Sequence, residues 1–250
     1  MSGVTIKSKR EIELMRAAGR LLADVHLQLA EIIAPGISTL DIDRICEEAI
    51  RKTDSIPSFL GYEGYPASVC VSINDEVVHG IPRADRFLEE GDIVSLDIGL
   101  IHDGYQSDAA RTHACGKISE EAQALIDVTR NSFFEGIKQA RAGNHLYDIS
   151  AAIGNYCMER GYGVVRDLTG HGIGTEMHED PAIPNFPQKR KGMLLCAGMT
   201  LAIEPMINIG RADVKFLDDG WGCVTADGSL SAHYENTILV TDGDPEILSL

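Results

Sequence analysis

Apolar positions recur at helical spacing in the first part of the chain. Between Ser8 and Leu29 they follow one another at steps of three and four residues, which predicts an amphipathic helix. Ser8 and Glu11 form the Ser-x-x-Glu pattern of a capping box, so this helix should begin directly after Ser8. The Pro-Gly pair at 35–36 ends the pattern. A second amphipathic helix is expected over about residues 39–52.

Strand-like runs follow the two helical segments. One covers about residues 68–73 and another about 93–101. The second run leads into the Asp-Gly pair at 103–104, a strong signal for a two-residue hairpin turn. Helical patterns then return over about residues 119–141 and 143–160, with further strands behind them. The order helix, helix, sheet therefore occurs twice, as in an α/β (α+β) chain built from two halves.

A constant offset links the two halves. Residues 36–42 and 143–149 agree in their first residue, Gly, and in their last two, Asp-Ile, and they lie 107 positions apart (36 to 143). Asp97 and Glu204 are separated by the same 107 positions (97 to 204). The matching segments and the acidic pair thus have the same separation of 107 residues, which favours an internal repeat.

Length and composition are compatible with one globular unit. The chain has 250 residues, of which 44% are hydrophobic and 24% are charged, close to globular averages. Between the halves, about 1–115 and 116–250, no Pro-rich, Ser-rich or charge-rich linker occurs. We therefore expect a single domain over residues 1–250, with the halves in a pseudo-twofold relation and the functional site between them.

The net charge, the apolar runs and the distribution of cysteines argue against several classes of protein. The net charge of −16 opposes a broad nucleic-acid surface, which needs Lys and Arg to neutralise phosphates. The sequence has no run of about 20 apolar residues for a membrane span and no signal-peptide pattern, so a cytoplasmic protein is expected. The cysteines are scattered singly, which favours buried thiols over disulfides or structural zinc. They are Cys46, Cys70, Cys115, Cys157, Cys196 and Cys223.

Hairpin counting brings two acidic residues together. If residues 103–104 form the turn, residue 99 faces Asp108, and Asp97 becomes the diagonal neighbour of Asp108 on one sheet face. Diagonal neighbours lie roughly 7–8 Å apart at the backbone, so both carboxylates can reach one point. Two such anions repel each other unless a cation lies between them. The alternative, two acids on a solvated sheet face, is opposed by the apolar residues around Asp97.

Two further acids interrupt strand-like segments. Glu204 lies in the apolar run 199–206, which Pro205 ends, and Glu235 leads into a strand of β-forming residues. A carboxylate in such a setting needs a partner. For either acid taken singly, a capped or surface position is an equally good interpretation.

A glycine-rich segment contains one candidate imidazole. His171 is the only functional side chain in Gly-His-Gly-Ile-Gly at 170–174, and His178 follows seven residues later. As a phosphate-binding loop the segment is weak, because no helical pattern opens there. A structural role is the alternative for each histidine.

Four carboxylates and one imidazole suit two divalent cations. Four negative charges would offset two doubly charged ions, and mixed carboxylate and imidazole ligands are accepted by manganese, iron, cobalt and zinc alike. Paired ions roughly 3.5–4 Å apart are typical of hydrolases that hold an activated water. The sequence therefore predicts amide hydrolysis without a protein nucleophile.

The five candidate ligands, in chain order, and the segments around them resemble the methionine aminopeptidases, in particular the bacterial type I branch. The five are Asp97, Asp108, His171, Glu204 and Glu235. The matching segments are residues 74–82, 97–108, 170–174, 177–181, 203–206 and 229–235. The resemblance covers essentially the whole chain.

The resemblance implies a role for each of the five. Asp97 would bind one metal ion, His171 and Glu204 the other, and Asp108 and Glu235 would bridge the two. Glu204 would also be the general base for the metal-bound water. The implied fold is the pita-bread fold, in which two αβ halves surround a curved, mainly antiparallel sheet, with helices outside.

Further residues are implied to contact the substrate. His79 and His178 would contact the scissile region without binding metal. An apolar, sulfur-tolerant methionine pocket would be formed by Phe59, Tyr62, Tyr65, Cys70, Met177 and Trp221. Bacterial relatives commonly have Phe in place of Met177 and often Cys in place of Phe59, and His233 replaces a frequent Gln. From the residues alone, ordinary core packing is the preferred interpretation of the pocket.

The implied activity is removal of the initiator methionine from nascent proteins and methionyl peptides when the second residue is small. A proline-directed aminopeptidase or dipeptidase of the same fold is an alternative, although such relatives usually carry a long N-terminal domain. A binding module that has lost its metals is another, opposed by the five intact ligand positions. A monomer is expected. The basic run at 188–191 suggests a transient ribosome contact, with a solvated loop as the alternative.

Overall fold

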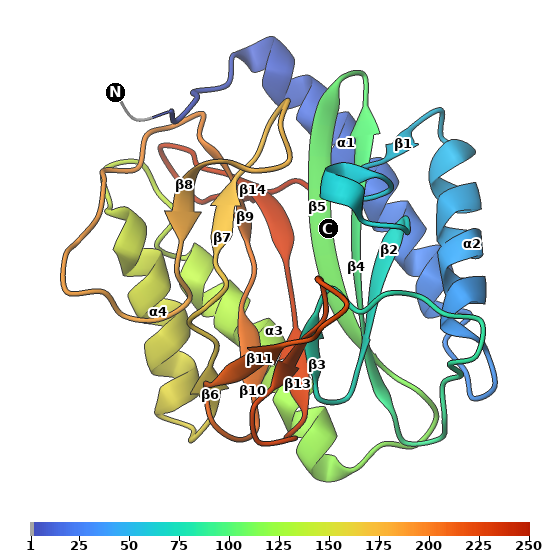
Figure 1. Ribbon diagram of the computed structural model, residues 1–250. Coiled ribbons are helices and arrows are strands. Elements are labelled where there is room, and N and C mark those ends of the chain that lie inside the picture. The colour runs from blue at the N-terminus through green and yellow to red at the C-terminus, as the bar shows by residue number, and fades with distance from the viewer. Residues whose placement is uncertain (1–2) are drawn as a thin grey trace.

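The computed structural model describes residues 3–250, so the first two residues of the expected domain lie outside the described part. Two helix pairs flank the strands. Figure 1 shows α1 and α2 beside β2, β4 and β5, and α3 and α4 on the side of β6 to β10. The helices are α1 (Lys9–Ala30), α2 (Thr39–Arg51), α3 (Glu120–Ile137) and α4 (Leu146–Met158), with a short 3-10 helix at Tyr62–Gly64.

Fifteen strands are present within residues 3–250. The first half contains β1 (Ile56–Pro57), β2 (Val69–Ile73), β3 (Glu76–Val78), β4 (Ile93–His102) and β5 (Tyr105–Ala114). The second half contains β6 (Gly163–Val164), β7 (Gly170–Gly172), β8 (Glu179–Ile183), β9 (Thr200–Ile203), β10 (Met206–Asn208), β11 (Val214–Phe216), β12 (Cys223–Thr225), β13 (Ser231–His233), β14 (Asn236–Leu239) and β15 (Glu246–Ile247).

The predicted capping box at the first helix is confirmed. The Ser8 side chain accepts from the Glu11 amide, and the Glu11 carboxylate accepts from the Ser8 amide. The second predicted helix also forms, over Thr39–Arg51. The predicted helices over 119–141 and 143–160 are both shorter in the structure. Residues 138–145 instead form the connection between α3 and α4, where Ala142 donates its amide to the carbonyl of Thr241.

The sheets are antiparallel in every strand pairing of the described chain. In the first half, β4 pairs with β5 and also with β1 and β2. In the second half, five strands follow the order β15-β14-β9-β7-β8. The predicted hairpin register is confirmed, because His102 pairs with Tyr105 and Gly99 pairs with Asp108.

The 107-residue offset recurs in backbone hydrogen bonds at the turn before the second helix of each pair. The Gly36 amide donates to the Leu88 carbonyl at 2.8 Å, and the Gly143 amide donates to the Leu195 carbonyl at 2.9 Å. Both glycines have positive φ angles, 92° and 91°, which few other residues adopt without strain. The predicted repeat therefore corresponds to the same turn at the entrance to α2 and α4.

β5 and the start of β14 meet in a second symmetric arrangement. Ala110 and Glu235 exchange backbone hydrogen bonds of 2.9 and 3.4 Å. Asp108 and Thr112 lie two positions before and after Ala110. His233 and Thr237 lie two positions before and after Glu235. The Ala110–Glu235 pair is thus the point where the two halves cross, and a pseudo-twofold axis passes through it.

Two threonine hydroxyls repeat one contact on either side of this pair. The Thr237 hydroxyl accepts from the Asp108 amide at 3.0 Å and donates to the Asp108 carbonyl at 2.9 Å. The Thr112 hydroxyl forms the same two bonds with His233, each 2.9 Å long. His233 is therefore the structural counterpart of Asp108 across the axis.

Each half has its own apolar core. One core lies between α1, α2 and the strands β2, β4 and β5, and the other between α3, α4 and the strands β8, β9 and β14. Of the six cysteines, only Cys196 is exposed, in agreement with the predicted buried thiols. Within residues 3–250, no helix combines the length and apolar character that a membrane crossing requires.

Candidate active site

The β4–β5 hairpin supplies two carboxylates to one cavity. Asp97 lies on β4, where it pairs with Cys70 of β2, and Asp108 lies on β5 opposite Gly99. Burial raises the pKa of Asp97 to about 7. Burial, and next the nearby Asp97, raise the pKa of Asp108 well above its usual value. Without a cation, these acids therefore hold protons to higher pH than exposed carboxyls do.

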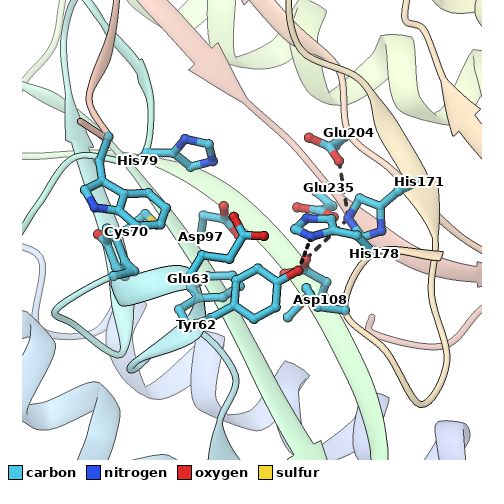
Figure 2. A pocket seen from close by; sticks show the side chains of 14 residues that line it. Tyr62, Glu63, Cys70, His79, Asp97, Asp108, His171, His178, Glu204 and Glu235 are labelled. Carbon is cyan, nitrogen blue, oxygen red and sulfur yellow. Dashed lines mark hydrogen bonds and ion pairs between the residues drawn. The ribbon is translucent and has the colours of Figure 1, made fainter. Parts of the chain in front are cut away.

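The second half supplies two more carboxylates. Glu204 directly follows β9, and Glu235 lies between β13 and β14 at the crossing of the halves. Burial raises the pKa of both, and the neighbouring Asp108 raises each further. Four acids from distant parts of the chain thus converge, as Figure 2 shows for Asp97, Asp108, Glu204 and Glu235.

His171 lies on β7 and presents one nitrogen to these acids. Its Nδ1–H donates to the carbonyl of Gly172 at 2.8 Å, which leaves the Nε2 lone pair free. Nε2 lies 3.6 Å from Glu204 Oε1 and 3.7 Å from Asp108 Oδ2. Burial, and next the neighbouring His178, lower the pKa of His171 to about 4, so the ring is neutral near pH 7.

The donor set fits divalent cations. Asp97 Oδ1, Asp108 Oδ1 and Glu235 Oε1 are buried and find no hydrogen-bond partner among residues 3–250. A buried anion without a partner is costly, so this arrangement needs positive charge. Two groups of three donor atoms each lie within 4.8 Å of one another. They are Asp108, His171 and Glu235 in one group, and Asp97, His233 and Glu235 in the other.

The acids line one part of a cavity of about 170 Å³. Every residue that the sequence and the resemblance assigned to the site borders this cavity. These residues are Phe59, Tyr62, Tyr65, Cys70, His79, Asp97, Asp108, His171, Met177, His178, Glu204, Trp221 and Glu235. Glu63 also borders it and was not predicted. It lies in an irregular turn with a φ of 49°, where neither spacing nor composition gives a signal.

Aromatic and sulfur-containing side chains form the apolar part of the cavity. Tyr65 packs edge-on against Trp221 with ring centroids 5.0 Å apart, and its hydroxyl donates to the backbone carbonyls of Val69 and Gly80. A Cβ atom at Gly99 would lie 2.9 Å from both Met177 and Phe59, so glycine is needed there. Phe59 and Met177 therefore both pack over Gly99.

Two histidines border the cavity from different halves. The His178 ring lies 4.4 Å from that of His171, and its Nδ1 forms a 2.8 Å hydrogen bond with the Tyr62 hydroxyl. His79 comes from the first half, and its ring stands edge-on to that of Trp221 at 6.3 Å. Burial, and next the nearby His178, lower the pKa of His79. In Figure 2, His79 lies above Asp97 and His178 lies to the right of Asp97 and Glu63.

The basic run at 188–191 lies away from this cavity, beside the start of α4. Lys189, Arg190 and Lys191 are exposed. The Lys191 carbonyl accepts from the Tyr147 amide at 3.0 Å. The run is thus anchored by its backbone, with its charged side chains in solvent.

Comparison with known proteins gives consistent results. The model of metallopeptidase family M24 matches residues 13–242. A curated protein of Clostridium acetobutylicum, named methionine aminopeptidase, is 54% identical over 247 residues, which are 99% of each chain. The crystal structure of methionine aminopeptidase from Rickettsia prowazekii has a TM-score of 0.97 at 40% identity, covering 99% of this chain and 100% of that one.

A solved structure of another specificity matches less completely. The Xaa-Pro dipeptidase from Bacillus anthracis has a TM-score of 0.76 at 25% identity. The match covers 98% of this chain and 61% of the dipeptidase chain. The shared fold thus extends to longer proteins that the present chain matches only in part.

Proposed function

The chain belongs to metallopeptidase family M24, and from this membership and the cavity described above we infer that it is a metal-dependent methionine aminopeptidase. It hydrolyses the amide bond after an N-terminal methionine. The observation that carries this assignment is the convergence of four carboxylates and an imidazole beside an apolar, sulfur-containing cavity. Its pita-bread fold is that of the methionine aminopeptidase structures.

Five residues of the two halves would hold the divalent cations. We propose that Asp97 would hold one ion and that His171 and Glu204 would hold the other, with Asp108 and Glu235 serving both. When bound, such ions supply a nucleophilic water at neutral pH and polarise the scissile carbonyl. Two ions for each chain, drawn from manganese, iron, cobalt or zinc, match the charge of the four acids.

The remaining steps fall to side chains of the chain itself. Glu204 takes the proton from the attacking water as general base. Neutral His79 and His178 donate hydrogen bonds to the scissile group and stabilise the charge that develops on its oxygen. The methionine side chain occupies the apolar part of the cavity against Tyr65, Cys70 and Trp221. The nascent chain leaves past the histidines, where only a small second residue fits.

The organisation of the whole protein is also proposed. Residues 1–250 form a single catalytic domain with halves of about 1–115 and 116–250, and the protein acts as a monomer in the cytoplasm. Its substrates are methionyl peptides and nascent proteins whose second residue is small. These proposals rest on the resemblance and on the symmetric contacts at the axis.

A comparison of two substrate classes tests the function. Protein stripped of metal should be inactive on Met-Gly-Met, and added Mn²⁺ or Co²⁺ should restore hydrolysis. Peptides of the type Xaa-Pro should be cleaved far more slowly. Preference for Xaa-Pro would favour the proline-directed alternative, and full activity after exhaustive chelation would contradict the metal mechanism.

The basic run 188–191 is proposed to contact the ribosome transiently. Its three exposed cations, Lys189, Arg190 and Lys191, form the densest basic run in the sequence of this acidic chain. Replacing all three by glutamine should reduce co-sedimentation with ribosomes at low salt. Unchanged co-sedimentation, with unchanged hydrolysis of a free tripeptide, would show that the loop is merely solvated.

A further inference from the structure

His233 is a buried imidazole without a hydrogen-bond partner beside the candidate metal ligands. Its side chain is 1% exposed, and neither ring nitrogen is paired within the described chain. Nε2 lies 3.7 Å from Glu235 Oε2 and 3.9 Å from Glu204 Oε2. A buried ring with both nitrogens unpaired is costly unless something else binds it.

The distances around His233 suit a shared cation better than a hydrogen bond. Hydrogen bonds from nitrogen to oxygen are about 2.7–3.2 Å long, so neither carboxylate is bonded directly. Two ligands that each lie about 2.0–2.2 Å from one ion are roughly 3–4.3 Å apart. His171 Nε2 stands 3.6 and 3.7 Å from its two carboxylates. The two imidazoles are therefore placed alike toward the acids.

The pseudo-twofold relation supports the same role. His233 is the counterpart of Asp108, held by Thr112 as Asp108 is held by Thr237. Because the backbone is fixed in the same way on both sides of the axis, both side chains are directed at the acids. Position 233 is thus oriented toward the site from the opposite half.

We propose that His233 is a further metal ligand, whose Nε2 binds the ion held by Asp97 and Glu235. The donor atoms of these three residues lie within 4.8 Å of one another. Each metal position then has one imidazole, His171 in one and His233 in the other. The inference rests on the proposed function and adds a ligand to its metal site.

The chemistry of the ring agrees with this assignment. Neither ring nitrogen forms a hydrogen bond with another residue of the described chain, so a neutral ring has a lone pair that no protein donor occupies. His233 does not border the substrate cavity, so it approaches the acids from the protein side. A nitrogen ligand favours cobalt and zinc over manganese more than a carboxylate does.

Cobalt-loaded protein provides a direct count of imidazole ligands. In paramagnetic proton spectra, the N–H of each cobalt-bound histidine gives a shifted, exchangeable signal. Wild-type protein with two equivalents of Co²⁺ should show two such signals, and His233→Gln and the matched variant His171→Gln should show one each. A single signal in wild type that His233→Gln leaves in place would overturn the proposal.

Calorimetric titration with Co²⁺ and with Mn²⁺ gives a second readout. His233→Gln should weaken one of the two Co²⁺ equivalents at least tenfold, with a smaller effect on Mn²⁺. If His233→Gln lowers kcat while both affinities stay at wild-type values, the residue only positions its neighbours and the proposal is wrong. Wild-type protein that binds no divalent cation would instead contradict the proposed function itself.

Thermal unfolding of the metal-free variant checks that it folds. Since Gln is an uncharged side chain of similar length to His, His233→Gln should retain the fold. Should its melting temperature collapse, His233→Asn provides the same comparison with a shorter amide. Two shifted signals in a folded His233→Asn protein would equally rule out the ligand role.

Discussion

The imidazoles of His79 and His178 differ from that of His171 in what they face. His171 directs a free Nε2 at two carboxylates, whereas His178 hydrogen bonds with Tyr62, and His79 stands against Trp221. Neither of the two belongs to a group of donor atoms that could hold an ion among residues 3–250. Their geometry therefore favours contact with substrate over contact with metal.

Replacing His79 or His178 by Ala should lower kcat by about 10²–10⁴, because each supplies a hydrogen bond or proton that is needed most in the transition state. Bound metal should stay near the wild-type amount. Turnover of a methionyl tripeptide and elemental analysis of the same samples provide the check. A parallel loss of metal would mean that these residues are ligands.

At the residue scale, most of the candidate site could be predicted from sequence. Asp97 and Asp108 follow from counting back along a two-residue hairpin, because register on a tight turn is a local property. Glu63 could not be found, since it enters the cavity through an irregular turn. The contacts of His233 could not be predicted from sequence either, because they depend on how the end of β13 packs against β5 of the other half.

At the scale of elements, the crossing of β5 and β14 depends on two buried hydroxyls. Thr237 and Thr112 each satisfy a backbone amide and a carbonyl of the opposite half. Valine has nearly the same shape as threonine but offers neither donor nor acceptor. Its introduction would therefore leave buried backbone groups unpaired.

We expect Thr237→Val and Thr112→Val each to lower the free energy of unfolding of metal-free protein by about 1–3 kcal/mol. Urea denaturation measures this change. Thr241→Val is the matched control, because the hydroxyl of Thr241 bonds within an exposed turn where water can replace it, so its effect should be small. Equal losses in all three variants would contradict a special role for the crossing.

Elements with local signals were predicted better than those held by distant contacts. The capped start of α1 and the β4–β5 hairpin follow from neighbouring residues. The two- and three-residue strands β3, β6 and β10 to β13 have too few residues for a periodic pattern, and their partners are remote in sequence. The prediction extends α3 to residue 141, whereas the helix ends at Ile137. The helical pattern of apolar residues could have continued, but the hydrogen bond from Ala142 to Thr241 holds the chain in another direction.

For the whole molecule, the four buried acids make stability depend on bound cations. Their repulsion opposes folding of the metal-free chain, while cations that bind only the folded state stabilise it. At a free concentration of about 100 times Kd, one such site contributes about 2.7 kcal/mol. The assembly of the two halves and the loading of the site are thus coupled.

Added Mn²⁺ or Co²⁺ should raise the melting temperature of chelator-treated protein. Above pH 7, where the buried Asp97 carboxyl is ionised without metal, Asp97→Asn should melt higher than metal-free wild type, because one buried charge is removed, and it should gain less from added cation. Calorimetric melting scans with and without metal measure both effects. A gain in Asp97→Asn as large as that of wild type would show that the stabilising ions bind elsewhere.

The crossing at Ala110 and Glu235 also acts as a pivot. A small rotation of one half against the other about the pseudo-twofold axis moves each atom in proportion to its lever arm, and the arm is shortest for residues on the axis itself. Glu235 lies on it, whereas the Tyr62–His178 hydrogen bond joins loops of opposite halves at the mouth of the cavity. Breathing of the halves should therefore widen or narrow the entrance while leaving the spacing of the central acids nearly constant.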